Sequence, residues 1–367
     1  MGQHRNCVRH QKREMLNTKR GLRSLSYIFI FATLFVSGCN IVKKESKTPT
    51  LLKTEISTQA FLMSEVDRFA SVESMRAFMD LKFEDNSFAQ FGSKEVYRSA
   101  DGEVVVQRPA SILLKVKVPV IKTDVAQMTS DGERFRVAIL QDGGSGRYKR
   151  FVMGSNHADY SKLQRELEGA EGNGEIRQNV NAFANLRPQH FTDAMLVRPI
   201  ADGNVYTKST IFQIEEDLNQ PRKSPLRIVN RGYYLLDEYV RGAGGELKIE
   251  RRFWFDRVGG IRLARQQIFN GSGEIESDIV YGREGKLTNG SGFERPPLQI
   301  IVTRPQEKYS MRLTYQSPES VTIGRTYPTT AFLLENSWGL EEVDLDRKLQ
   351  EVNAQSQKPT TTVTRAQ

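Results

Sequence analysis

Cys39 is the residue whose surroundings most clearly indicate a reaction, because its thiol follows an apolar segment and two small residues, Ser37 and Gly38. The apolar segment spans residues 25–36, and three basic residues lie in the stretch 19–23 before it. A basic start, an apolar core of about a dozen residues and small residues before a cut describe a secretory signal peptide. The segment is too short to span a bilayer stably as a helix. The sequence therefore predicts export.

A cysteine directly after Ser-Gly resembles the bacterial lipoprotein signal. The resemblance implies that a diacylglycerol is attached to the Cys39 thiol, that residues 1–38 are removed, and that the new amino group of Cys39 is acylated. Val36 departs from the leucine that this signal prefers three residues before the cysteine. An ordinary signal peptide with an incidental cysteine and an N-terminal membrane anchor are the alternatives. Translation from Met15 would leave a signal of ordinary length.

Composition excludes several classes of function once residues 1–38 are set aside. The whole chain has 53 Lys and Arg against 44 Asp and Glu, but the leader holds seven of the bases and one of the acids, which leaves 46 against 43. A nucleic-acid-binding domain is normally strongly basic, so nucleic acid is not an expected partner. Cys7 leaves with the leader and Cys39 is the predicted lipid site, so no thiol remains for a disulfide or a thiolate metal site.

The chain after the cysteine begins with a polar stretch, 39–55, that we interpret as a flexible tether. Apolar residues then recur at helical spacing over 56–71. From residue 75 the period changes to two, which indicates strands over 75–83, 103–107, 111–118, 124–129 and 135–140. Pro109 is expected in the corner between two of them, because proline lacks the N–H that a strand ladder needs.

The second half has two parts. Residues 156–200 predict a helical insertion, with helices over 156–170 and 176–185 and a short third near 188–194. Strands of eight to ten residues joined by glycine-rich turns follow over 231–281, and two more are expected at 298–303 and 308–316. The polar tail 341–367 is predicted to be disordered. The predicted fold is α+β and mainly β: a large, curved antiparallel sheet that does not close, with helices covering its concave face, over residues 56–340.

Three short segments resemble the LolA/LolB superfamily of periplasmic lipoprotein carriers and receptors. They are Gly-Glu-Val-Val-Val-Gln-Arg-Pro at 102–109, Pro119, and Ser-Asp-Gly-Glu-Arg-Phe at 130–135. The resemblance implies a half-barrel with a helical lid that holds acyl chains in an apolar cavity. This chain departs from the family pattern in its length, in the insertion at 156–200 and in its strands after 290.

On this resemblance, the apolar strand faces are the candidate ligand lining, and ordinary core packing is the alternative. The lining candidates are Met79, Leu81, Phe83, Val104, Val106, Ile112, Leu114 and Val116. Arg108 could anchor the lid or a lipid head group, or could cap backbone carbonyls or pair with a carboxylate. The apolar run 151–153 is either a buried strand or an exposed loop.

Motifs of the common enzyme classes are not found. The sequence has no Gly-x-Ser-x-Gly elbow and no His-Glu-x-x-His pattern, and His157 and His190 suggest no triad. The acidic run 215–217 is expected to be solvated, and the glycine-rich run 142–147 to be a turn. We therefore expect no enzyme, no metal and no cofactor, although an envelope enzyme stays open as a third alternative.

The prediction is a lipoprotein anchored through Cys39 in the outer membrane, facing the periplasm. In enterobacterial lipoproteins an Asp directly after the lipidated cysteine causes retention in the inner membrane, and this chain has Asn40 at that position. Its expected partners are the membrane, acyl chains such as palmitate, and an envelope protein. The alternative is a non-catalytic scaffold whose core is filled by its own side chains.

Overall fold

The computed structural model describes residues 48–85, 95–96, 99–118, 123–141, 149–158, 160, 163, 188–217, 220–282, 284–285 and 295–356. Residues 49–367 form one compact unit, separate from residues 1–48. Cys39 and the predicted signal peptide lie outside the described residues, as do Pro119, the glycine-rich run 142–147 and most of the predicted insertion. Within the described ranges, no helix has the length and apolar character needed to cross a membrane.

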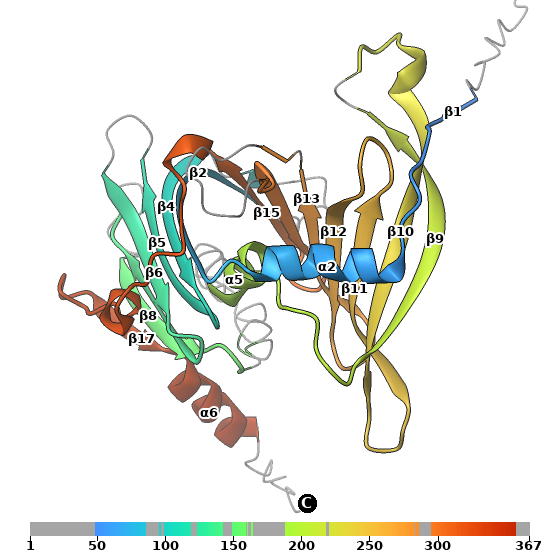
Figure 1. Ribbon diagram of the computed structural model, residues 1–367. Helices are drawn as coiled ribbons and strands as arrows, with labels where there is room; N and C mark the ends of the chain where they lie inside the picture. Colours follow the sequence, from blue (N-terminus) through green and yellow to red (C-terminus); the bar gives the residue numbers. More distant parts are fainter. Residues whose placement is uncertain are drawn as a thin grey trace, which may run out of the picture. The chain divides into compact units, whose positions relative to one another are not determined.

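The unit is built on one sheet (Figure 1). Its longer strands are β2 (Ser74–Asp85), β4 (Ala100–Gln107), β5 (Ser111–Lys117), β6 (Asp124–Ser130), β7 (Arg134–Ile139), β8 (Arg150–Ser155), β9 (Val205–Glu216), β10 (Ile228–Arg241), β11 (Leu247–Asp256), β12 (Arg262–Phe269), β13 (Ile275–Tyr281), β14 (Gln299–Arg304) and β15 (Tyr309–Tyr315). Short strands complete it: β1 (Thr50–Leu51), β3 (Glu95–Val96), β16 (Thr322–Ile323) and β17 (Glu341–Asp344). The helices are α2 (Gln59–Ala70), α5 (Pro188–Met195) and α6 (Leu345–Ser356), with 3-10 turns η2 (Pro225–Arg227), η3 (Pro318–Ser320) and η4 (Thr329–Phe332).

The pairing is antiparallel except for β1 with β10 and β17 with β8. The first long strand, β2, lies in the middle of the sheet, between β4 and β15. From β2 the sheet runs through β4, β5, β6, β7 and β8 to β17 on one side. On the other side it runs through β15, β14, β13, β12, β11 and β10 to β9. Among the described residues β9 and β17 do not pair with each other, so the sheet is unclosed as predicted.

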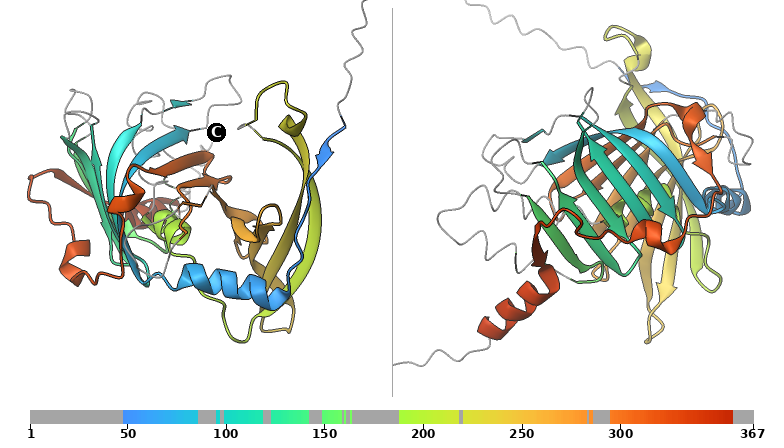
Figure 2. Two further views of the ribbon diagram at one scale, coloured as in Figure 1. Left: turned by 45° about the horizontal axis from the view of Figure 1, so that its top comes forward. Right: turned by 90° about the vertical axis from the view of Figure 1, so that its left-hand side faces the viewer.

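Two helices cover the apolar inner face of this sheet. Helix α2 begins at the N-cap Thr58, whose side chain accepts a hydrogen bond from the Phe61 N–H, and this satisfies an amide that the helix itself leaves unpaired. Its buried stripe includes Leu62, Val66 and Phe69, which recur at helical spacing. The strands on either side of β2 form two arms of the sheet, β4 to β8 in one and β9 to β15 in the other. Helix α5 lies between these arms (Figure 1; Figure 2, left).

The opposite, outer face of β4 to β6 is partly covered by the chain after β15 (Figure 2, right). The Gln107 side chain exchanges two hydrogen bonds with the backbone of Tyr327, and the Thr129 hydroxyl accepts one from the Leu334 N–H. Phe332 in η4 is buried. This covering segment explains why Val105, on the outer face of β4, is also buried.

Two domain boundaries differ from the sequence prediction. The tether predicted for 39–55 is part of the sheet at its end, because β1 pairs with β10 and the Glu55 N–H donates to the Arg257 carbonyl. The tail predicted to be disordered over 341–367 instead begins with β17 and α6. Although this tail is polar overall, it contains three apolar residues at helical spacing, Leu345, Leu349 and Val352. These residues pack against the core.

Candidate functional site

The predicted lining residues lie together on the inner face of β2, β4 and β5. Cross-strand partners on this face form continuous rows: Ala77 pairs with Val104, and Val104 pairs with Leu114. The same face continues across the other arm of the sheet, where Leu81 pairs with Leu313 and Leu313 with Ile300. The alternation read from the sequence therefore placed these side chains on one face.

Gly102 makes close packing possible in the middle of this face. A Cβ at this position would lie 2.6 Å from Leu81 Cδ1 and 2.8 Å from Leu81 Cγ. Because real carbon atoms do not approach so closely, any larger residue would displace the Leu81 side chain. The glycine that the sequence places at the start of this strand thus admits a leucine from β2 into the inner layer.

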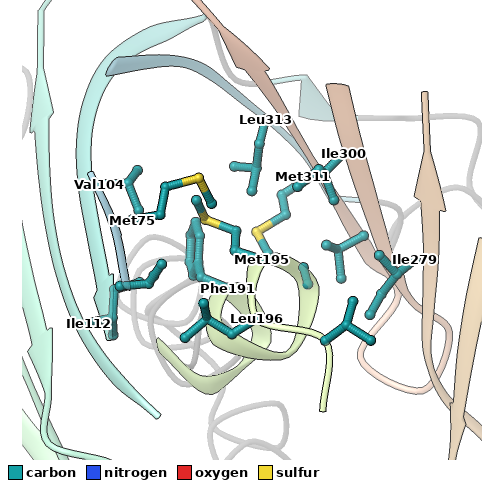
Figure 3. Packing of buried hydrophobic residues seen from close by; sticks show 14 of the residues in the cluster. Met75, Val104, Ile112, Phe191, Met195, Leu196, Ile279, Ile300, Met311 and Leu313 are labelled. Carbon is teal, nitrogen blue, oxygen red and sulfur yellow. The ribbon is translucent and has the colours of Figure 1, made fainter. Parts of the chain in front are cut away.

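Helix α5 supplies the side chains that fill the space over this face (Figure 3). Phe191 and Met195 of α5 and Leu196 directly after it are buried, and they lie between Met75 and Val104 on one side and Ile279 and Ile300 on the other (Figure 3). Met75, Met195 and Met311 meet around Phe191 (Figure 3). Methionine is unbranched and polarizable, so a contact rich in methionine adapts easily to a different partner.

Burial separates the eight predicted residues into two groups. Six of them are at most 1% exposed: Met79, Leu81, Val104, Val106, Ile112 and Leu114. Phe83 and Val116 are half-buried and pack against the same cluster. This burial agrees with the core-packing alternative, and the lining role stays a prediction. Because these six residues are buried, an acyl chain could touch them only after the side chains packed on them had moved.

Arg108 connects the two segments that follow the helices. Its Nε donates to the Val72 carbonyl at 2.9 Å, just after α2, and its Nη2 donates to the Val197 carbonyl at 2.8 Å, just after α5. Burial lowers the pKa of the Arg108 guanidinium, and the charge of Glu73 opposes this shift. Of the alternatives read from the sequence, carbonyl capping is the one these contacts match. The same contacts hold the end of α5 to the sheet.

Further polar contacts hold α5 and the residues after it. The Tyr281 hydroxyl donates to the Ala194 carbonyl at 3.2 Å, and His190 Nδ1 contacts the Tyr309 hydroxyl. Arg251 donates to the carbonyls of Arg198 and Pro199, at 2.7 and 2.9 Å. Hydrogen bonds to backbone carbonyls and to the His190 ring thus hold α5 and the residues after it, in addition to the apolar contact.

Arg251 and Glu238 form a buried ion pair beside this segment. Burial alone would raise the pKa of the Glu238 carboxyl, but hydrogen bonds and the charge of Arg251 outweigh it and the pKa is lowered. Tyr206 donates to Glu238, and burial together with that bond raises the pKa of the Tyr206 hydroxyl to about 12. Sequence reasoning missed this pair. The sequence does carry a signal for the pair, because in each strand a charged residue takes a position where the alternation expects an apolar one. Glu238 lies two residues after Leu236, and Arg251 lies two residues before Phe253.

Asp193 is a titratable group on α5 itself. Burial raises the pKa of its carboxyl, and the neighbouring charge of Arg198 opposes the shift while that of Glu276 adds to it. Ionising this carboxyl therefore costs free energy in the folded state.

The other sequence candidates are placed as follows. The apolar run 151–153 forms part of β8, with Phe151 and Val152 buried, so the exposed-loop alternative is wrong. Glu215 accepts from the Tyr233 hydroxyl and Glu216 pairs with Arg227. His157 is exposed beside Glu133, whereas His190 is buried. Within the described ranges no group of three His, Cys, Asp or Glu side chains could hold a metal ion.

Comparison with known proteins gives remote similarity only. By sequence, no protein family and no curated protein matches the chain. The structure is similar to a LolA superfamily protein from Nitrosomonas europaea, with 11% identity, a TM-score of 0.37, and coverage of 76% of this chain and 99% of that one. It is also similar to a putative outer membrane lipoprotein-sorting protein domain from Vibrio parahaemolyticus (10% identity, TM-score 0.36, 74% and 94% covered). A third similar structure is a DUF1329 family protein from Desulfovibrio piger (12%, 0.34, 76% and 96%).

Proposed function

We propose that this protein is a non-catalytic lipoprotein that binds acyl chains on the inner face of its sheet, in the space that α5 fills in the described structure. The observation that carries the proposal is the contact in Figure 3. Among the described residues, α5, a helix of eight residues, covers the part of this apolar face that β4, β5 and β14 form, through a contact rich in methionine. An acyl chain offers the same apolar surface as the helix and can compete with it.

The energies of the two occupants are comparable. Burial of a large apolar side chain is worth about 2 kcal/mol, so Phe191, Met195 and Leu196 together contribute about 6 kcal/mol to holding this segment, in addition to its polar contacts. Each buried methylene is worth about 0.8 kcal/mol. Roughly eight methylenes therefore match these three side chains, and a chain of about 16 carbons exceeds them. The proposal predicts a preference for long chains over short ones.

The proposed setting is the periplasmic face of the outer membrane. The motif at Cys39 supports lipid attachment, and Asn40 supports the outer rather than the inner membrane. Three acyl chains would exceed the two signals that durable attachment needs. Such a protein would pass lipid or lipoprotein acyl chains between the membrane and an envelope partner.

Native mass spectrometry and lipid extraction of the unit 49–367 test the proposal. We expect a one-to-one complex with palmitate and much weaker binding of a six-carbon acid. A matched pair of variants on neighbouring residues of β4 assigns the site, because Val104 faces inward and Val105 outward and both are buried. Val104→Thr should weaken palmitate binding severalfold, and Val105→Thr should leave it unchanged. Equal effects of the two variants, or no palmitate bound at all, would overturn the proposal.

A scaffold lipoprotein with a filled core is the second candidate. The near-complete burial of six inner-face residues favours it. In that case the unit would extract without lipid, and it would recover an envelope protein in cross-linking from intact cells.

A further inference from the structure

The hairpin of β9 and β10 extends beyond the neighbouring strand. Strand β10 pairs with β9 from Ile228 onward, but its pairing with β11 begins only at Tyr233. Over residues 228–232 the two-stranded ribbon has β1 as its other neighbour, through Thr50 and Leu51. In Figure 1 this tip carries η2 and lies at the end of β10 where the chain enters the unit.

The two faces of this ribbon differ in character. One face is polar: Arg231 bonds Asp256 at 2.6 Å and approaches Glu215 at 3.6 Å. The register places Leu51, Asn230 and Ile214 on the other face, next to the pair of Gly232 and Phe212. Three apolar side chains on that face are largely exposed, Leu51 at 67%, Ile214 at 65% and Phe212 at 50%. Asn230 lies between Leu51 and Ile214, and the Arg257 guanidinium lies 5.9 Å from the centre of the Phe212 ring.

Exposed basic residues lie in the segment just before η2. The Thr50 hydroxyl donates to the Pro225 carbonyl, which places η2 beside β1, and Leu226 in that turn is 41% exposed. Residues 218–230 contain three basic residues, and the acidic run 215–217 precedes them. Glu215 and Glu216 of that run pair with Arg231 and Arg227. Arg227 is paired with Glu216, while Arg222 and Lys223 are exposed. Exposed apolar side chains together with exposed cations match the interface of an anionic bilayer.

The chain before β1 limits where this tip can lie. Pro49 is ten positions after Cys39, and a fully extended chain spans at most about 3.5 Å per residue, or about 35 Å. If Cys39 carries the lipid, β1 and the tip beside it stay within that distance of the bilayer. This step rests on the proposed anchoring; the exposed apolar side chains and the basic residues do not.

We propose that the tip formed by Leu51, Phe212, Ile214 and Leu226, with Arg222 and Lys223, docks on an anionic phospholipid surface. The contact fixes which side of the unit faces the membrane. Since Phe212 and Ile214 lie on the same face of β9 and β10 as the core residues Tyr234 and Leu236, docking brings one end of the inner face to the lipid.

The test uses the full chain, processed in cells and reconstituted in vesicles of phosphatidylethanolamine and phosphatidylglycerol. Ile214→Cys and Leu226→Cys each receive an environment-sensitive fluorophore, and Ser272→Cys, in the exposed turn between β12 and β13, is the matched control. We expect a blue shift and quenching by lipid-borne nitroxide at 214 and 226 but not at 272. Each basic residue near an anionic surface strengthens membrane binding by a factor of about five. The double variant Arg222→Gln with Lys223→Gln should therefore lower the ratio of docked to undocked protein about 25-fold.

Equal emission at all three positions would overturn the docking proposal. A blue shift that occurs only in nanodiscs holding two copies, and not in those holding one, would assign the tip to self-association instead. The intact mass of the processed chain reports separately whether Cys39 carries lipid, and palmitate binding by the unit 49–367 reports separately on the inner face. Failure of docking is therefore distinguishable from failure of the proposed function.

Discussion

Releasing α5 should strengthen acyl binding while it weakens the fold, and Arg108 is the residue that tests this. Arg108→Met keeps the length of the side chain but removes both hydrogen bonds, to the carbonyls of Val72 and Val197. A hydrogen bond from a charged group contributes about 1.5–3 kcal/mol. Because Arg108 is half-buried, we take the lower end, and the two bonds together give about 3 kcal/mol.

Of these two Arg108 bonds, the one to Val197 holds the end of α5. About 1.5 kcal/mol of the lost stability therefore favours release of the helix. A difference of about 1.4 kcal/mol is a factor of ten in an equilibrium constant. The Arg108→Met variant of the unit 49–367 should therefore bind palmitate about tenfold more tightly, with a free energy of unfolding lower by about 3 kcal/mol. Fluorescent fatty-acid displacement and urea unfolding measure the two effects.

Arg76→Met is the matched control, because Arg76 pairs with Glu103 and is partly exposed. A surface ion pair is worth about 1 kcal/mol or less, and palmitate affinity should not change. If Arg108→Met destabilises the fold but leaves affinity within twofold, α5 does not compete with the acyl chain. If affinity falls for palmitate but not for the neutral alcohol of the same length, Arg108 binds the head group instead.

Three further substitutions test single parts of the account. Asp193→Asn should raise the free energy of unfolding at pH 7, because burial raises the pKa of Asp193 and opposes its ionised form; in a pH series of urea titrations the gain should vanish below about 3.8. Glu238→Gln should cost about 3–5 kcal/mol at pH 7 by leaving Arg251 buried without its partner; since the pKa of Glu238 is lowered, this cost should shrink as pH falls below 4.5. Gly102→Ala should cost about 1–3 kcal/mol by overpacking Leu81, and Leu81→Val in the same chain should recover part of it; a neutral effect in calorimetry would contradict the packing at this glycine.

Strong alternation is the reason that most strands could be predicted. The stretch 75–83 has every second residue apolar, and the structure places it in β2. The meander was readable because glycine-rich turns separate its strands, such as the one between β12 and β13. Residue period and turn chemistry are local properties, so a single sequence carries them.

The filling of the inner face could not be predicted in the same way. A short helix near 188–194 was expected, but nothing local indicates that Phe191 and Met195 would meet Met75 and Met311. The Arg251–Glu238 pair likewise depends on the register of β10 with β11, which shifts between Glu238 and Tyr239. The order of 345–356 was missed because three apolar residues stabilise a helix only where the core offers them a partner.

The most direct test of the central claim follows the methionine methyl groups when an acyl chain binds. Spectra of the unit 49–367 with carbon-13 methyl methionine are recorded before and after palmitate is added. The account predicts that Met75, Met195 and Met311 shift and show contacts to the acyl chain, while Met153, on the outer face of β8, stays in place. If palmitate leaves those three signals unchanged, or shifts Met153 alone, the acyl chain does not take the place of α5 and the account is contradicted.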